Sequence, residues 1–255
     1  MTARTCITTC LLVAFAMSCV DPIDFKPRRE ADLLVVDGKV TASPGPHYVR
    51  LTKSEKVGRS DNFPPVSGAE LTLLDDQGLE AAYTETSPGL YEVYATCVPG
   101  RAYRLRLRIA NGLTYESAPD LMPQTVPVNG SYFTFTSNKN LNTYVRFRNP
   151  DTSEKGPYLK WRMESQYQIS EVYCWPLEPV LTCYFTRRPD NQLLPLANGS
   201  QLERGVLYDK AISTHWVDDT YGEVTYFNIF QESLSLEAYQ YWQKINLVLS
   251  QRGSI

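Results

Sequence analysis

"PGRAYRLRLRIANGLTYESA", residues 99–118, contains the pattern that decides the fold class. Apolar and basic residues alternate through its centre: Tyr103, Leu105, Leu107 and Ile109 against Arg104, Arg106 and Arg108. A period of two is typical of a β-strand that buries one face and exposes the other. Gly100 and Gly112 lie in turn-forming segments on either side and predict tight reversals. The arginines are interpreted as a solvated stripe rather than an anion-binding patch, with nearby acidic residues to offset them: Glu80, Glu85 and Glu92.

Strand patterns of the same kind fill the preceding residues. "HYVRLTKS" (47–54) places Val49 and Leu51 on one face, and "GAELTLLDDQG" (68–78) repeats the pattern before a polar turn. "LLVVDGKVTA" (33–42) is a buried-type run that the dipeptide Asp37-Gly38 is predicted to interrupt with a turn. Short strands separated by turns predict an antiparallel β-sandwich over residues 32–120, of immunoglobulin-like or transthyretin-like type.

A second unit is predicted beyond "ESAPDLMPQTVPV" (116–128), where three prolines indicate a boundary. "TYVRFRNP" (143–150) and "PYLKWRMESQ" (157–166) read as half-buried strands, the second with Leu159, Trp161 and Met163 inward and Lys160, Arg162 and Glu164 outward. One helix is predicted, over 236–250, capped by Ser235 and stapled by Leu234 and Tyr239. The fold class is therefore mainly β, with a second β-rich domain at 121–255 that ends in this helix.

"FAMSCVDPIDF" (15–25) ends a short apolar run at Cys19. The run, Leu11 to Met17, is too short to cross a bilayer, which takes about 20 apolar residues. Arg4 before it and the small residues Ala16 and Ser18 in front of Cys19 are similar to a bacterial lipoprotein signal. We expect a signal peptide at 1–18, lipid attachment at Cys19 and a tether at 19–31. A plain secretory signal with an incidental cysteine is the alternative.

Three further cysteines remain in the expected mature chain. Cys174 and Cys183 flank a loop between two strand-like stretches and are predicted to form a disulfide, whereas Cys97 is predicted to be a buried free thiol. A zinc site is disfavoured because the two histidines, His47 and His215, lie far away in sequence. We find no nucleophile elbow, zinc-protease motif or phosphate loop, and a net charge of −3 argues against nucleic acid. No catalytic, cofactor or metal residue is therefore predicted, although carboxylates from distant strands leave a hydrolase open.

Several segments together resemble the Bacteroidota lipoproteins of domain-of-unknown-function family 4249. They are the leader ending at Cys19, "LLVVDGKVTASPGPHYVRLTKS", "VSGAELTLLDD", "PGRAYRLRLRIANGLTYESAP", the cysteine-containing middle and "FQESLSLEAYQYWQKI". The resemblance implies an immunoglobulin-like sandwich, a second β-rich domain and an outer-membrane lipid anchor. It also implies an accessory role beside a TonB-dependent transporter, capturing a small ligand or glycan or docking onto the barrel. Members usually continue past "QRGSI" (251–255), which implies a C-terminally short member. A surface adhesin that binds host or matrix polymer is the alternative function.

Overall fold

The alternating segment forms the central strand of an antiparallel sheet, which we call sheet B. The structure is a computed structural model that describes residues 33–54, 63–136, 140–151, 156–171, 181–187, 193–216 and 225–251. Sheet B has the order β4-β3-β7-β8, with β9 also paired to β7, and its strands are β3 (Glu70–Asp75), β4 (Glu80–Ala82), β7 (Ala102–Arg108), β8 (Thr114–Glu116) and β9 (Asp120–Leu121). Tyr103 and Leu107 are buried and the arginines between them are exposed, which confirms the predicted alternation.

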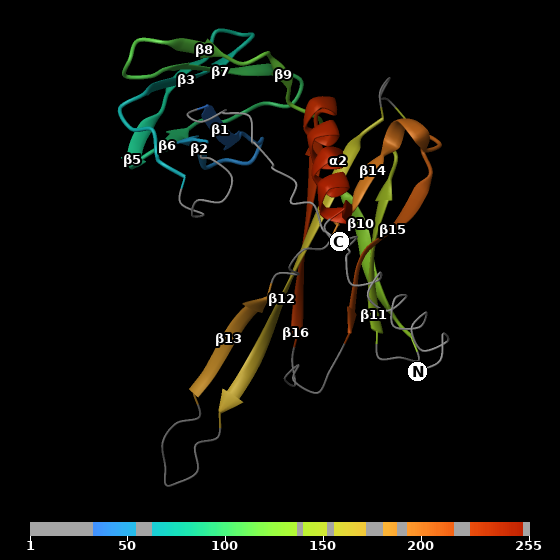
Figure 1. The fold of residues 1–255 in the computed structure, drawn as a ribbon. Coiled ribbons are helices and arrows are strands. Elements are labelled where there is room, and N and C mark those ends of the chain that lie inside the picture. Colours follow the sequence, from blue (N-terminus) through green and yellow to red (C-terminus); the bar gives the residue numbers. More distant parts are fainter. Residues whose placement is uncertain are drawn as a thin grey trace, which may run out of the picture.

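A second antiparallel sheet, sheet A, closes the N-terminal sandwich. Its order is β1-β2-β6-β5, and its strands are β1 (Leu34–Lys39), β2 (Pro46–Lys53), β5 (Thr84–Ser87) and β6 (Leu90–Tyr94). The two sheets share one apolar core, to which sheet A contributes Val49, Leu51 and Tyr91 and sheet B contributes Leu71 and Leu107. Figure 1 shows this unit in blue and green. The predicted antiparallel arrangement is confirmed, and its immunoglobulin-like or transthyretin-like type stays a prediction.

The turn predicted at Asp37-Gly38 is wrong, because β1 runs straight through both residues. Their partners in β2 are Arg50 and Val49. A Cβ atom on Gly38 would lie 2.8 Å from Cγ2 of Val49, so the glycine allows the two strands to approach closely. The dipeptide therefore serves packing between strands and not a reversal of the chain.

The remaining strands form two sheets that face each other across a separate core. Sheet C has the order β10-β11-β15, with β10 (Val128–Phe135), β11 (Asn140–Arg148) and β15 (Leu207–Trp216). Sheet D has β12 at its centre and contains β12 (Tyr158–Glu171), β13 (Leu181–Arg187), β14 (Leu196–Asn198) and β16 (Thr225–Leu234), with a 3-10 turn at Gly199–Gln201. We call sheets C and D the second sandwich. The described strands up to β9 and those from β10 onward thus belong to different sheets, and the predicted domain boundary at residue 120 stays a prediction.

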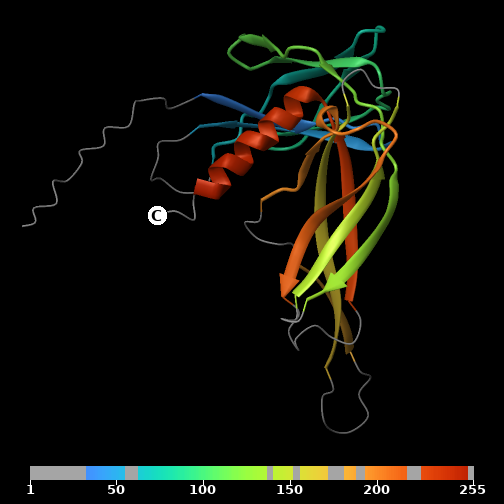
Figure 2. The same ribbon diagram turned by 90° about the vertical axis from the view of Figure 1, so that its right-hand side faces the viewer.

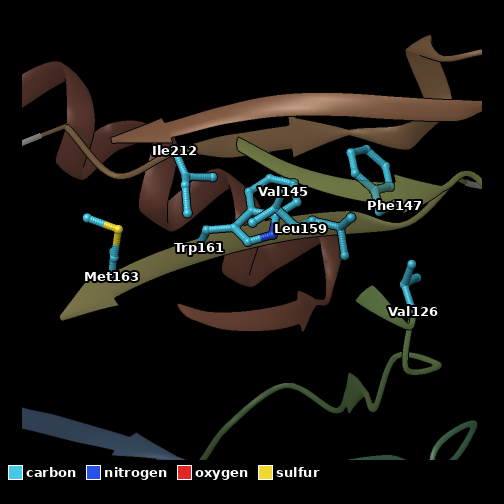
Figure 3. Close-up of a cluster of buried hydrophobic side chains, with 7 residues drawn as sticks. All are labelled: Val126, Val145, Phe147, Leu159, Trp161, Met163 and Ile212. Atoms are coloured by element: carbon cyan, nitrogen blue, oxygen red, sulfur yellow. The ribbon is translucent and has the colours of Figure 1, made fainter. Parts of the chain in front are cut away.

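Trp161 lies at the centre of the second core (Figure 3). Its side chain is fully buried, and its ring centroid lies 5.5 Å from that of Phe147 on the opposite sheet. The indole Nε1 donates to Gln231 in β16 (2.8 Å), whose Nε2 donates in turn to the carbonyl oxygen of Val126 (2.7 Å). Because a buried indole N–H needs an acceptor, this chain of hydrogen bonds satisfies Trp161 and holds the proline-rich linker against β16.

The second face of β12 is covered, contrary to the sequence prediction. Helix α2 (Leu236–Gln251) packs on β12 and β16, and the ring of its Tyr239 lies 4.9 Å from that of Tyr158. Lys160 and Glu164, predicted to point outward, are 7% and 8% exposed. The alternation of residues along β12 is correct, but α2 and neighbouring side chains cover the polar face.

The helix itself is confirmed, with bounds one residue longer than predicted. The Ser235 hydroxyl accepts a hydrogen bond from the backbone N–H of Ala238 (3.1 Å), as an N-cap residue should. Leu234 and Tyr239 are both buried, in agreement with the predicted staple.

Candidate functional site

The predicted lipid-attachment residue, Cys19, lies outside the described residues, together with the leader and the tether. Cys174 also lies outside them. The backbone of Cys183 belongs to β13, where its partner in β12 is Ile169. The hairpin between the two predicted strands is confirmed, whereas the disulfide and the lipid anchor stay predictions.

The hairpin of β12 and β13 projects from the second sandwich. β16 pairs with β12 only as far as Tyr167, and beyond that residue the described part of the chain gives β12 only β13 as a neighbour. Figures 1 and 2 show the two strands extending away from both sandwiches. Tyr184 and Phe185 in β13 are 60% and 47% exposed. A two-stranded ribbon with open edges and exposed aromatic rings is suited to contact another protein.

More aromatic side chains are exposed where the hairpin leaves the sandwich. Tyr226 and Phe230 of β16 are 54% and 39% exposed, and the guanidinium of Arg162 lies 4.0 Å from the Phe230 ring. The register places Tyr226 on the same face of sheet D as Tyr184. We use the term aromatic end for the exposed rings of β10, β13 and β16: Phe133, Phe135, Tyr184, Phe185, Tyr226 and Phe230. The register places Phe185 on the opposite face of sheet D from Tyr184. Exposed aromatic side chains are typical of an interaction surface.

The outer face of sheet C carries a second candidate, a stacked pair of tyrosines beside an ion pair. The rings of Tyr132 and Tyr144 lie 5.0 Å apart and nearly parallel. Arg146 donates to both oxygens of Asp209 (2.7 and 2.8 Å), and Tyr132 donates to the same carboxylate (3.1 Å). The hydrogen bonds from Arg146 hold the pKa of Asp209 below its usual value. A hollow of about 290 Å³ lies beside them, between Tyr132, Arg146 and the bulge around Gly130.

A chain of charges joins the N-terminal sandwich to sheet D. Glu232 in β16 lies 3.0 Å from Nζ of Lys39 in β1 and 2.9 Å from Nζ of Lys160 in β12. The Lys160 ammonium also lies 4.0 Å from the centre of the Trp242 ring in α2. Burial lowers the pKa of Lys160. Burial by itself would raise the pKa of Glu232, but the hydrogen bonds from Lys160 and Lys39 keep that pKa below its usual value. Sequence patterns missed this cluster because Lys160 occupies a position that alternation assigns to solvent.

Cys97 is a free, buried thiol, as predicted. Its Sγ lies 3.9 Å from Nε2 of His47, an arrangement that superficially resembles a nucleophile and its base. His47 is also buried and its Nε2 lies 3.0 Å from the carbonyl oxygen of Ala95. Burial raises the pKa of Cys97, which disfavours the thiolate that a nucleophile requires. We therefore interpret this pair as part of the core.

The arginine stripe of β7 is solvated and paired, but the predicted acidic partners are wrong. Arg106 and Arg104 lie 2.9 and 3.3 Å from Glu116, because the register of β7 and β8 places Glu116 opposite Arg106. Glu85, one of the predicted partners, instead accepts hydrogen bonds from the backbone N–H groups of Gly68 and Gly89. Arg104 and Arg106 thus share a single carboxylate.

The described residues offer neither a metal site nor a membrane-spanning helix. They contain no group of three or more His, Cys, Asp or Glu side chains that could hold a metal ion. Among the helices in the described ranges, none is long and apolar enough to span a membrane. The hollow beside Tyr132 has no aspartate or glutamate among its described lining residues.

The described residues form a mainly β protein with two sandwiches, a C-terminal helix and a projecting hairpin. The model of the family described as "Domain of unknown function (DUF4249)" matches residues 20–255, and the chain belongs to this family. The predicted family is thereby confirmed, whereas the lipid anchor and the transporter that the resemblance implies stay predictions. No curated protein matches the chain.

Proposed function

We propose that this chain is a non-enzymatic envelope protein, attached to the outer membrane through lipid at Cys19, that docks onto a TonB-dependent transporter or captures a ligand for it. The aromatic end and the projecting hairpin serve as the docking surface in this proposal. Cys19, which carries the lipid in this proposal, precedes a polar segment suited to a tether. The chain belongs to the family whose resemblance implies the transporter.

The observation that carries the proposal is the exposure of aromatic rings on a hairpin that, beyond Tyr167, has no further strand neighbour among the described residues. Tyr184 is 60% exposed and Phe135, at the end of β10, is 72% exposed. Aromatic residues are enriched at protein interfaces and often supply most of the binding energy there. The open edges of β12 and β13 beyond Tyr167 also offer backbone groups to which a partner strand can pair.

A pull-down from membranes of the native host tests the docking. The tagged wild-type protein should recover an outer-membrane transporter under mild detergent, and the double variant Y184S/F185S should recover at least about tenfold less, because interface hot spots contribute 2 kcal/mol or more. The matched control is Y94S, which removes a 75% exposed tyrosine from the N-terminal sandwich. Recovery of no transporter by the wild type, or equal recovery by Y184S/F185S, contradicts the proposal.

The anchor is tested separately by mass spectrometry of the mature N-terminus. A lipid-modified Cys19 at residue 1 of the mature protein is expected, and the variant C19A should be released from the membrane fraction. An unmodified Cys19, or cleavage at another position, would end this part of the proposal.

The outer face of sheet C favours a second candidate function, binding of a surface or matrix glycan as an adhesin. Sugars stack on exposed aromatic rings and take hydrogen bonds from nearby polar groups, and Tyr132, Tyr144, Arg146 and Asp209 offer both. A glycan array separates the two functions: binding that is lost in Y132S but kept in Y184S/F185S favours the adhesin.

A further inference from the structure

An open groove lies along one side of the second sandwich, between α2, β15 and the segment that leads into β14. We call it the Lys210 groove. Its volume is about 660 Å³, within the range of small-molecule sites. The residues that line it are Leu193, Leu194, Pro195, Leu196, Lys210, Ala211, Ile212, Tyr239, Gln243, Asn246, Leu247 and Ser250.

The wall of the groove is largely aliphatic and is held in place by polar contacts. Asn246 of α2 accepts a hydrogen bond from the backbone N–H of Leu194 and donates one to its carbonyl oxygen, each 2.8 Å long. Ile212 belongs to the buried core, whereas Leu193 and Leu247 are 54% and 60% exposed at the rim. Exposed leucines beside an apolar wall are favourable contacts for an aliphatic chain.

Lys210 is the one charged residue among the described residues of the groove. Its partner in β11 is Val145, which is fully buried between the sheets, so the register directs Lys210 to the inner side of sheet C. Its neighbour Asp209 pairs with Arg146 on the opposite, outer face. Within the described ranges Lys210 has no carboxylate partner, and no acidic residue lines the groove. Lys210 is half-buried as a residue, and an ammonium group without a counter-charge favours an anion.

We propose that the Lys210 groove binds a single-chain anionic amphiphile, a fatty carboxylate, with its head group on Lys210 and its chain along the leucines. The charge selects an anion, and the aliphatic wall selects a hydrocarbon tail. The proposal does not depend on docking at the aromatic end, because none of the residues of that surface lines the groove.

Calorimetric titration of the purified protein with dodecanoate, below its micelle concentration, tests the proposal. Dodecanoate should bind roughly tenfold more tightly than dodecan-1-ol or dodecyltrimethylammonium, since only the carboxylate carries a charge opposite to that of Lys210. K210M keeps the aliphatic stem and should abolish that preference. The matched control is K244M, which replaces an exposed lysine of α2 outside the groove. K244M should retain the preference for dodecanoate.

A charge-reversal pair at the rim keeps the test valid if K210M folds poorly. Leu247 is 60% exposed, so L247K and L247E lose the same apolar side chain and differ only in charge. Dodecanoate should bind L247K more tightly than L247E. Absence of dodecanoate binding to the wild type, equal affinities for wild type and K210M, or equal affinities for L247K and L247E would each overturn the proposal.

Discussion

Replacing Glu232 by glutamine is expected to destabilise the protein, because Lys160 then lacks its carboxylate on a covered face of sheet D. Lys160 Nζ lies 2.9 Å from Glu232, and its side chain is 8% exposed. Removing one partner of a fully buried ion pair costs about 3–5 kcal/mol. The Glu232 side chain is 25% exposed and Lys39, its second partner, is 56% exposed. Because water screens this pair in part, we expect a loss of about 2 kcal/mol.

The loss should depend on pH with a defined sign. The folded-state pKa of Glu232 is lower than its ordinary value of 4.5. Its contribution to the free energy of unfolding is therefore fully present above that ordinary value and is lost as pH falls through the folded-state pKa. Glutamine does not titrate, so the difference between wild type and E232Q should shrink from pH 7 toward the acid limit.

Urea unfolding followed by tryptophan fluorescence measures this difference. The control is E70Q, because Glu70 is 80% exposed and 4.0 Å from Arg108, and it should change the free energy of unfolding by less than about 0.5 kcal/mol. The double variant K160M/E232Q should be more stable than E232Q, since it leaves no uncompensated charge. The reasoning is refuted if E232Q unfolds with the wild-type free energy at neutral pH, or if K160M brings no recovery in E232Q.

Three further predictions concern the cores and the helix. W161A should cost about 3–5 kcal/mol in urea unfolding, because it leaves a cavity and removes the donor that satisfies Oε1 of Gln231; a loss below 1 kcal/mol would contradict the central place of Trp161 in its core. Cys97 should resist iodoacetamide in the folded protein and react in urea, as measured by mass spectrometry of its peptide, since it is 2% exposed; modification of the native protein would show that this core opens. S235A should cost about 1 kcal/mol by removing the N-cap of α2, with the exposed S250A near neutral as its control; equal stability of the two variants would refute the cap.

How far the sequence predicts the structure depends on whether a feature is local. The alternation in residues 102–108 and the cap at Ser235 were both confirmed, because each is set by residues within a few positions along the chain. The dipeptide Asp37-Gly38 predicts a turn, because this pair of residues commonly forms one. The deciding contact, Gly38 against Val49, comes from the neighbouring strand and leaves no trace in the local pattern.

The candidate sites were less accessible to sequence analysis for the same reason. The pair of Tyr132 and Tyr144 arises from the register of β10 with β11, and the Lys210 groove requires β15 to meet α2. Lys210 is unusual because it is a charged residue on the inner face of β15. The alternation of residues does not show which face of β15 is the inner one. Binding surfaces on β proteins are assembled from several strands, so single segments seldom reveal them.

The sequence by itself determined that this chain is mainly β, which side chains alternate along its strands, where its one described helix begins and which family it belongs to. The tertiary structure alone decided which faces are covered. Lys160 has the spacing of a solvent-facing residue, yet Trp242 and Glu232 enclose it from other elements. The physical reason is that a two-residue period fixes the direction of a side chain relative to its own strand, whereas burial depends on what distant segments pack against that side.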